Sequence, residues 1–444
     1  MENNVETELL SAVRLSAERY IRAGKVVEVG LSGGLDSVVL LHLLNRLKQD
    51  CAFSLCAIHV HHGLNQQADA WAEFCRDLCL KLDIPFRLAK VSVNSSGLGV
   101  EAAARKERYR IFSDGPANIM ALAHHADDQV ETFMLAAVRG GGIRALAAMP
   151  EWRKLDELKN IWRPLLKFSR DQLSCYAETC GLLHVEDLSN NDVDFLRNWF
   201  RHEILPKYSE RVPHYKQQVL ANVSSLQADL AMIDEVVAAD WQDVYYEGRF
   251  DVSRWKKLSQ MRKQHQLVHF SKLTGLGVPN RKSIECFATI LEQASSAEWS
   301  LPLGRAYLYG GYLFPVKDKF EQHYSWLSTG NSLRGRLKNN LVEFGIGLIR
   351  HDYGLSEDSV AAVAQVRAVV PGDTLLLACG RKSVRKILQE HHVPPFIRSL
   401  WPVLVNIENQ CMAVVNIQVS VDHGCRDGLL PIFYEFNQYI LEPK

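Results

Sequence analysis

Residues 25–139 alternate short apolar runs with amphipathic stretches, and this alternation limits the fold more than any other feature of the sequence. The apolar runs predict strands, and the stretches between them have the spacing of helices. We expect strands at Val26–Leu31, Leu55–Val60, Phe86–Val93 and Ile119–Ala123, and helices at Ser37–Leu47, Ala68–Leu82, Val100–Phe112 and Asp127–Val138. Strands and helices that alternate in this way form a parallel sheet with helices on both faces.

The rest of the chain changes character twice. In Val212–Trp241 the apolar residues are spaced by four and three, which predicts one long amphipathic helix. After Arg350–Asp358, short apolar runs and the turn Pro371-Gly372-Asp373 indicate a small α/β module. A chain of 444 residues is about three typical domains long. We therefore expect an α/β domain at 1–210, a mainly helical domain at 211–350 and a small α/β domain at 351–444.

Composition excludes several classes of protein. No apolar stretch approaches the roughly 18 residues of a membrane span, and the start of the chain lacks the pattern of a secretory signal, so we expect no membrane association and a cytoplasmic location. The 10 cysteines form no C-x-x-C pair, which argues against zinc ribbons and thioredoxin-type sites. Because 51 Lys and Arg balance 51 Asp and Glu, a nucleic acid would be held by local basic patches.

The first expected strand leads into Ser32-Gly33-Gly34-Leu35-Asp36-Ser37, and a helix follows at once. Two adjacent glycines let the backbone turn tightly and approach an anion, while the start of the helix offers unpaired N–H groups and a positive dipole end. The hydroxyl groups of Ser32 and Ser37 add further donors. The lysine of a Walker loop is absent. The alternative is a simple glycine turn in which Asp36 and Ser37 cap the helix.

This hexapeptide resembles the SGGxDS loop of the PP-loop ATP pyrophosphatases, which cleave ATP between the α and β phosphates and adenylate a substrate. Further motifs narrow the resemblance to the tRNA(Ile)-lysidine synthetase family. The most specific is the block from His124 to Thr132; the others are His59–Leu64, Glu101–Arg105, Arg163–Leu166, Glu186–Asn190, Arg197–Arg201 and, more weakly, Pro371–Asp373 and Lys382–Arg398. Asn65 and Leu188 depart from the family pattern, which expects a basic residue and a proline there.

The resemblance implies a PP-loop, Rossmann-like catalytic domain and a defined reaction. Members of the family use ATP and Mg²⁺ to join L-lysine to C2 of the wobble cytidine in tRNA(Ile) with a CAU anticodon. The reaction passes through an adenylated cytidine and releases AMP and pyrophosphate, and it changes the codon that is read from AUG to AUA. The sequence leaves the oligomeric state open, with a homodimer among the alternatives.

The chemistry of this reaction suggests roles for particular residues. Charge on the leaving pyrophosphate must be neutralised by Mg²⁺ and by donors at the glycine loop, and Asp36 or Asp128 can supply hard oxygen ligands for the metal. The ammonium of lysine, with a pKa of about 10.4, needs a carboxylate that binds it and takes up a proton. We expect Asp128 and Glu131, three residues apart on one helix face, to bind lysine or the metal, with His125 nearby. The alternative is that Asp127 and Asp128 only complement the helix dipole.

Several basic residues are candidates for binding phosphate or RNA. Arg105 and Arg108 lie on an Ala-rich helix and could clamp phosphates, although a solvated helix face is the alternative. Basic clusters also recur at Arg254–Lys257 and at Arg334–Lys338. We expect tRNA to contact Arg197, Arg201, Lys382, Arg385 and Lys386, each of which could instead belong to an ordinary solvated surface.

Other functions share parts of this pattern. A tRNA thiolase or a small-molecule amide ligase, such as a GMP or NAD synthetase, has the same loop. Cytidine thiolases need paired C-x-x-C cysteines, and a glutamine-fed ligase needs a glutaminase nucleophile; neither is found in the sequence. A third alternative is a non-catalytic RNA-binding protein that keeps a relic nucleotide site.

Overall fold

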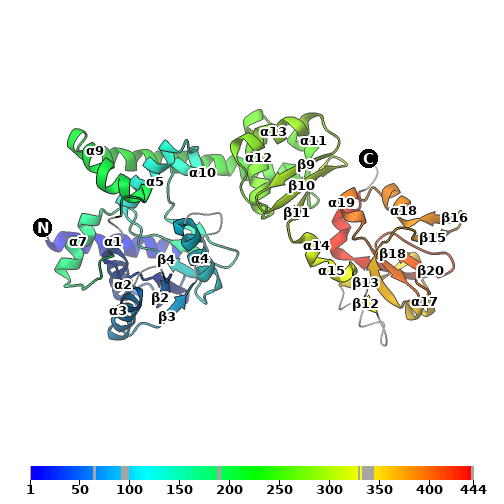
Figure 1. Cartoon of the computed structure of the whole chain (residues 1–444), viewed down its shortest axis with the longest axis horizontal. Coiled ribbons are helices and arrows are strands. Elements are labelled where there is room, and N and C mark those ends of the chain that lie inside the picture. Colours follow the sequence, from blue (N-terminus) through cyan, green and yellow to red (C-terminus); the bar gives the residue numbers. More distant parts are fainter. Residues whose placement is uncertain are drawn as a thin grey trace. The chain divides into compact units, whose positions relative to one another are not determined.

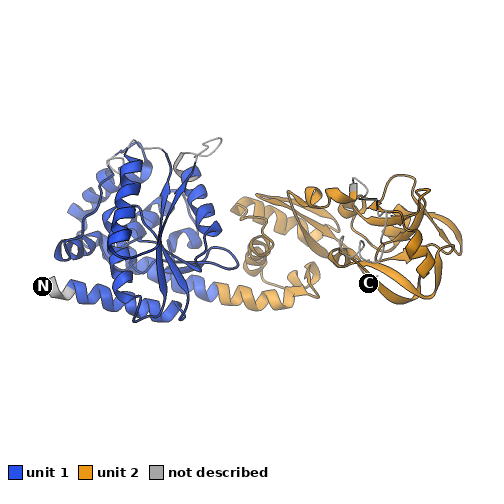
Figure 2. Ribbon diagram, turned by 90° about the horizontal axis from the view of Figure 1, so that it is seen from below, with its two compact units in different colours: residues 1–233 blue, residues 234–444 orange. Residues whose placement is uncertain are grey.

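A computed structural model describes residues 2–63, 67–91, 100–187, 192–328, 331–332 and 345–441 (Figure 1). Asn65, Leu188, the cluster Arg334–Lys338 and the end of the third expected strand at residues 92–93 lie outside them. The chain divides into two compact units, Met1–Ile233 and Asp234–Lys444 (Figure 2). Among the described helices, none has both the length and the apolar character that a membrane span requires.

The first unit is built on a six-stranded sheet with the order β3-β2-β1-β4-β6-β5. The neighbouring strands are parallel except for β5, which runs antiparallel to β6 at the edge. The parallel sheet predicted from the sequence is therefore confirmed. The strands are β1 (Val26–Gly30), β2 (Ser54–His61), β3 (Phe86–Lys90), β4 (Ile119–Ala121), β5 (Trp152–Lys154) and β6 (Asn160–Trp162).

Helices cover both faces of this sheet, because alternate strand residues enter two separate cores. Val27 and Val29 of β1 pack in the core that also holds residues of α1, α2, α3 and α7. Met120 of β4 packs on the opposite face, against Phe112 of α4. The helices are α1 (Glu2–Tyr20), α2 (Leu35–Leu47), α3 (Ala68–Lys81), α4 (Val100–Asp114), α5 (Ala126–Val138), α6 (Ile143–Leu146) and α7 (Arg170–Thr179).

A charged residue interrupts the apolar pattern of β1. Glu28 is 1% exposed, and its carboxylate accepts hydrogen bonds from Arg87 of β3, from Nε at 2.6 Å and from Nη2 at 2.8 Å. Two parallel charge-assisted bonds satisfy both carboxylate oxygens. A Cβ at Gly115 would lie 2.3 Å from Nη2 of Arg87, so this glycine leaves room for the guanidinium. The sheet therefore contains an ion pair that is stable only when both partners are present.

A run of helices follows the sheet. It comprises α8 (Leu196–Trp199), a π-helical turn (Phe200–Ile204), α9 (Leu205–Arg211) and α10 (Tyr215–Val244). Val130 of α5 packs in one core with residues of this run, Phe200, Leu205, Tyr215 and Val219. The long helix expected at Val212–Trp241 is confirmed, with bounds shifted by three residues.

The second unit begins within α10, and three shorter helices then pack on a small sheet. Helices α11 (Val252–Trp255), α12 (Gln260–Leu273) and α13 (Arg281–Gln293) share a core with an antiparallel sheet of order β7-β8-β11-β10-β9. The helical character expected for this region is confirmed, but the sequence analysis did not anticipate the sheet. Its strands are β7 (Tyr245–Tyr246), β8 (Arg249–Asp251), β9 (Ala297–Leu301), β10 (Gly304–Tyr309) and β11 (Tyr312–Lys317).

The remainder of the second unit packs around a further core, which also includes Phe314 of β11, and confirms the small α/β module. Its sheet has the order β12-β14-β17-β18-β19, beside the pairs β13–β20 and β15–β16. The division into three domains stays a prediction. The elements are α14 (Phe320–His323), α15 (Ser325–Ser328), β12 (Asn331–Ser332), β13 (Ile346–Leu355), α17 (Glu357–Ala362), β14 (Gln365–Ala368), β15 (Thr374–Leu377), β16 (Gly380–Ser383), α18 (Val384–Glu390), α19 (Pro395–Arg398), β17 (Pro402–Val405), β18 (Cys411–Val414), β19 (Gln418–Val419), β20 (Gly424–Phe433) and a 3-10 helix (Tyr434–Tyr439).

The ion pair of the sheet gives a prediction about stability. Replacing Arg87 by Ala leaves the Glu28 carboxylate buried and unpaired, so we expect the unfolding free energy of the first unit to fall by about 3–5 kcal/mol. Urea unfolding followed by circular dichroism measures the change. Arg14→Ala, which removes an exposed ion pair with Asp50, is the control and should cost no more than about 1 kcal/mol. Equal losses for the two variants would contradict a structural role for the Glu28–Arg87 pair.

Candidate functional site

The glycine loop joins the end of β1 to the start of α2 in a conformation that only glycine fits well. Gly33 has a φ of +91°, and a Cβ there would lie 2.9 Å from Cγ2 of Val185 and 3.2 Å from Sγ of Cys75. The N–H of Val185 donates to the carbonyl of Gly33 at 2.9 Å, which fixes the turn from outside. Because α2 starts at Leu35, its free backbone N–H groups point to the end of the sheet.

The two serines of the loop bond to each other and to the loop backbone. Their Oγ atoms are 3.1 Å apart, and Ser37 Oγ donates to the carbonyl of Gly34 at 2.9 Å. The N–H groups of Ser32 and Gly34 donate to Ser37 Oγ at 3.2 Å and to Ser32 Oγ at 3.3 Å. The hydroxyl groups that the sequence suggested as phosphate donors therefore also hold the shape of the loop.

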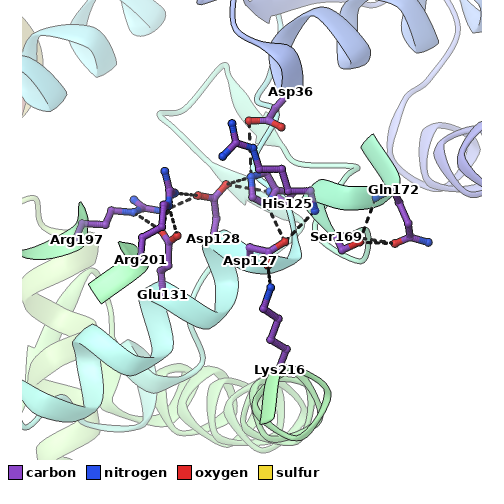
Figure 3. Close-up of polar contacts among 11 residues, drawn as sticks. Asp36, His125, Asp127, Asp128, Glu131, Ser169, Gln172, Arg197, Arg201 and Lys216 are labelled. Atoms are coloured by element: carbon purple, nitrogen blue, oxygen red, sulfur yellow. Dashed lines mark hydrogen bonds and ion pairs between the residues drawn. The ribbon is translucent and has the colours of Figure 1, made fainter. Parts of the chain in front are cut away.

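The sheet topology brings the loop to a second motif. Strands β1 and β4 are parallel neighbours, while the chain continues from β1 toward β2 on the other side. A crevice for ligands forms where strand order reverses in this way, at the carboxyl ends of the strands. Asp36 follows β1 and His125 follows β4, and their Oδ2 and Nε2 atoms are 3.7 Å apart (Figure 3).

His125 is the N-cap of α5 and is surrounded by carboxylates (Figure 3). Its backbone N–H donates to Oδ2 of Asp128 at 3.1 Å, and its ring Nε2 lies 3.6 Å from the same oxygen. Its Nδ1 lies 3.6 Å from Oδ2 of Asp127. Burial lowers the pKa of this histidine, but Asp127, Asp128 and Asp36 outweigh the burial and hold the pKa above its ordinary value. The ring is therefore held toward its charged form.

Asp36 has one oxygen left to bind a cation. Its Oδ1 is buried and has no hydrogen-bond partner among the residues that the structure describes, while Oδ2 faces His125. Burial raises the pKa of Asp36, and the neighbouring Asp128 adds to this, whereas His125 opposes it. A buried carboxylate oxygen without a partner is costly unless something occupies the site. A cation, or a donor from a ligand, would satisfy this oxygen.

Asp128 and Glu131 pair with Arg197 and Arg201, and we call these four residues the acid–arginine cluster (Figure 3). Arg197 donates from Nη2 to Oδ1 of Asp128 and from Nε to Oε2 of Glu131, both at 2.7 Å. Arg201 binds Glu131 through Nε at 2.6 Å and Nη2 at 2.9 Å. Burial lowers the pKa of Arg201, but its bonds to Glu131 raise it overall. Two acids and two bases balance in formal charge.

The site fits Mg²⁺ only in part. Asp36 offers a free oxygen, but both oxygens of Asp128 already contact Arg197 or His125. Within the described residues, no group of three or more His, Cys, Asp or Glu side chains is arranged to hold a metal. Mg²⁺ commonly uses one or two carboxylates and completes its shell with phosphate and water. The donors of this site suit a metal that arrives with a polyphosphate.

Comparison with known proteins identifies the family. A tRNA(Ile)-lysidine synthase from Neisseria meningitidis serogroup B is 44% identical over 413 residues, which cover 93% of this chain and 97% of that protein. The chain belongs to the tRNA(Ile)-lysidine synthase family. A second tRNA(Ile)-lysidine synthase, from Chromobacterium violaceum, is 38% identical over 417 residues, 91% of this chain and 94% of that protein.

Two family models match regions near the two ends of the chain. A model described as a PP-loop domain matches residues 1–208, and one described as the C-terminal substrate domain of this synthase family matches residues 364–429. A U34-tRNA thiolase from Methanococcus maripaludis covers 50% of this chain and 80% of its own, with 19% identity and a TM-score of 0.42. A likeness this weak supports no inference about function.

The structure brings together some of the residues expected from the sequence. Asp36, His125 and Asp128 form one network, and Glu131 joins it through the two arginines of the acid–arginine cluster. Arg105 lies apart on α4, exposed, and donates to the hydroxyl of Tyr109 at 3.2 Å. Its catalytic role, like the roles of the other candidate residues in this chain, stays a prediction.

The residues expected to contact tRNA lie in different settings. Arg197 and Arg201 point into the acid–arginine cluster, so their guanidinium groups already bind carboxylates. In the second unit, Lys382 of β16 pairs with Glu390 of α18, while Arg385 and Lys386 of α18 are exposed. Contact of these five residues with RNA stays a prediction.

Sequence reasoning missed the residues that hold Asp127. Oδ2 of Asp127 accepts the backbone N–H of Arg170 at 2.8 Å, and Oδ1 binds Nζ of Lys216 (Figure 3). These contacts aim Asp127 at the Nδ1 side of His125. The position of Asp127 within the His-His-x-Asp-Asp block marks it as a candidate. Lys216 lies on the long helix α10 and belongs to no motif, so no local pattern marks it as a partner of Asp127.

The carboxylates around His125 give a prediction about its titration. Since they raise the pKa of His125 in the folded chain, its contribution to stability is full below the unfolded value of about 6.5 and is lost as the pH rises through the folded pKa. Asp127→Asn should lower that pKa, as measured by NMR of the imidazole in metal-free protein. Asp77→Asn, which changes an exposed residue of α3, is the control. A pKa of His125 equal to or below 6.5 in the wild type would contradict this view of the site.

Proposed function

We propose that this protein is a tRNA(Ile)-lysidine synthase, a ligase that forms AMP as it joins L-lysine to C2 of the wobble cytidine of tRNA(Ile) with a CAU anticodon. The observation that carries the proposal is the 44% identity with a relative of that name over 97% of the relative's length. The product nucleoside pairs with A, so the tRNA reads AUA in place of AUG. We propose the cytoplasm, where tRNA and ATP are found, as its location.

ATP binding is assigned to the glycine loop. The PP-loop domain implies use of ATP, and the loop residues Ser32 to Ser37 present backbone N–H groups at the start of a 13-residue helix. Asp36 would hold Mg²⁺ through its free Oδ1, with Asp128 as the weaker candidate because its oxygens are engaged. The metal would supply charge neutralisation on the phosphates. The protein itself would bind the phosphates through the N–H groups of the loop.

The first step is adenylation of the base. O2 of the cytosine forms a bond to the α-phosphorus of ATP, the bond from that phosphorus to the bridging oxygen breaks, and pyrophosphate leaves. Adenylation therefore converts O2, which is a poor leaving group on C2, into part of AMP, which is a good one. His125 lies beside Asp36 at the carboxyl edge of β4, and its charged ring would stabilise the negative oxygens of the reacting phosphate.

The second step needs lysine in a reactive form. Its side-chain amine forms a bond to C2, the bond from C2 to O2 breaks, AMP leaves with the oxygen, and a proton passes to a carboxylate. The acid–arginine cluster suits a free amino acid, because Asp128 and Glu131 can bind ammonium groups while Arg197 or Arg201 binds the α-carboxylate. These groups already lie in one network with His125.

Binding of the tRNA is assigned to basic residues of both units. Arg385 and Lys386 are exposed on α18, and Lys382 lies beside them on β16. Such groups grip phosphates without reading sequence. Arg197 and Arg201 would reach RNA or lysine only by exchanging their carboxylate partners. Arg105 would contribute to binding a phosphate near the reacting base.

The experiment that tests the function uses the purified protein with tRNA(Ile), ATP and either lysine, sulfide or ammonia. We expect the mass of the wobble nucleoside to increase by the lysine adduct only when lysine and ATP are both present. Incorporation of sulfur would indicate a thiolase, and amide formation on a small molecule would indicate another PP-loop ligase. Binding of tRNA with no release of pyrophosphate under any condition would indicate a non-catalytic RNA-binding protein.

Replacing Asp36 by Ala tests the nucleotide site. We expect AMP formation to fall by at least about 100-fold, since a charged group at the leaving pyrophosphate is lost. Pyrophosphate release measures the change, and Asp77→Asn is again the control. Wild-type turnover of ATP in the Asp36 variant would remove the loop carboxylate from the mechanism.

Replacing Asp128 by Asn tests the lysine site. The substitution keeps the shape of the side chain but removes the charge that would bind an ammonium, so the KM for lysine should rise by about tenfold or more. The KM for ATP should change little. A steady-state lysine titration at saturating ATP makes the comparison. An unchanged KM for lysine would assign Asp128 to another role.

A further inference from the structure

Three further arginines, distinct from Arg197 and Arg201, gather on the α4 side of the sheet. The guanidinium carbons of Arg105 and Arg153 lie 5.0 and 5.3 Å from the centre of the Tyr109 ring, and Arg105 also donates to the hydroxyl of that tyrosine. Arg163 influences the same phenol, whose pKa falls because these three positive charges outweigh its burial. We call Arg105, Arg153 and Arg163 the arginine cluster.

The base of the arginine cluster is buried. Arg163 is 1% exposed and donates from Nη1 to the carbonyl of Pro150 at 3.0 Å and from Nε to Nδ1 of His124 at 3.3 Å. Burial lowers the pKa of Arg163, and burial also lowers that of His124, which accepts this bond as a neutral ring. Two neutral acceptors thus orient a buried cation.

No acid balances these charges. Across the part of the chain that the structure describes, no carboxylate lies within ion-pair distance of Arg105, Arg153 or Arg163. A desolvated group of like charges is unfavourable by itself, and an anionic ligand relieves the repulsion. The lysine substrate carries ammonium groups, which the arginine cluster would repel. Lysine also carries one carboxylate, but its net charge is positive, whereas ATP and tRNA are polyanions whose phosphate groups match the charge of the arginine cluster.

The sheet order separates this cluster from the glycine loop. Arg163 follows β6 and Arg153 lies on β5, while the loop follows β1, and β4 with His125 stands between them. Neighbouring strands are about 4.8 Å apart, so β6 is about 10 Å and β5 about 14 Å from β1. A triphosphate bound at the loop would place its negative charge on the β1 side of His125. The β5–β6 side of His125, where the arginine cluster lies, would then remain for the second substrate.

We propose that Arg105 and Arg153, supported from below by Arg163 and Tyr109, bind a phosphodiester of the tRNA strand beside the target cytidine. Arginine forks match phosphate oxygens, and guanidinium planes also stack on unpaired bases, as in single-stranded loops. The proposal rests on the proposed function. It places the acceptor base between the triphosphate and the acid–arginine cluster, with its backbone anchored on the α4 side. The α- or β-phosphate of ATP is the other source of the same chemistry.

The test replaces exposed Arg153 by Ala and by Lys. We expect Arg153→Ala to weaken tRNA binding by about tenfold and to reduce the slope of log K against log salt by about 0.7, the share of one single-strand phosphate. The KM for ATP should stay at the wild-type value. Arg153→Lys keeps the charge but not the fork, so it should restore the salt slope and only part of the affinity. Arg76→Ala, on exposed α3, removes one charge elsewhere as the control.

Filter binding of tRNA without ATP, together with steady-state kinetics, separates the outcomes. An increase in the KM for ATP with unchanged tRNA affinity would overturn the proposal in favour of a nucleotide phosphate site. Equal losses in Arg153→Ala and Arg76→Ala would overturn it in favour of a general effect of net charge. Failure of the wild-type protein to form lysidine would refute the proposed function instead, and the tRNA binding data would still decide whether the arginine cluster holds RNA.

Discussion

The functional geometry depends on the contact between Asp36 and His125. These residues are almost 90 positions apart in the chain, and they meet only because β1 and β4 are parallel neighbours while the connections after them run to opposite sides. The crevice at such a reversal receives the starts of two helices, α2 and α5, with their positive ends toward one point. The glycine loop, the acidic residues of α5 and the partners of those acids are all positioned from this junction.

Two groups of charged residues lie near that junction, and they differ in whether their charges are balanced. The acid–arginine cluster pairs every charge with an opposite one and is electrically balanced, whereas the arginine cluster on the α4 side carries three guanidinium groups without a carboxylate partner among the described side chains. A balanced group suits a ligand that carries both signs. An unbalanced one suits a polyanion. Substrates of unlike charge can therefore occupy neighbouring positions without competing for the same residues.

Most of the fold follows from local periodicity. The four strands and four helices expected within residues 25–139 begin within a few residues of where the alternating pattern puts them, because burial on two faces of a parallel sheet leaves little freedom. The hairpin of β10 and β11 was missed although Gly310-Gly311 lies between two alternating runs, a recognised turn signal. The two strands have only six residues each, and an alternation this short is a weak signal beside the long helical pattern of Val212–Trp241.

The candidate site was only partly predictable. The loop and the His-His-x-Asp-Asp block lie in short motifs, so the sequence alone names Asp36, His125 and Asp128. The ion-pair partners of the acidic residues could not be predicted in this way, because they are distant in the sequence. Arg197 and Arg201 bind Glu131 across about 70 residues, and Lys216 binds Asp127 across 89. Such pairs depend on how α8 to α10 pack on α5, which no local pattern specifies. The same holds for Arg163: its motif and the block that begins at His124 were both noted, but neither motif predicts that Nε of Arg163 donates to His124.

The thiol of Cys75 packs against the space that Gly33 leaves open, and burial raises its pKa to about 12. Oxidants and alkylating agents attack the thiolate, so a thiol that stays protonated is chemically quiet. A larger, oxygenated sulfur at this position would press on the backbone of the turn and distort it. Burial therefore keeps this sulfur, which lies against the glycine turn, in the protonated form that reacts slowly with oxidants.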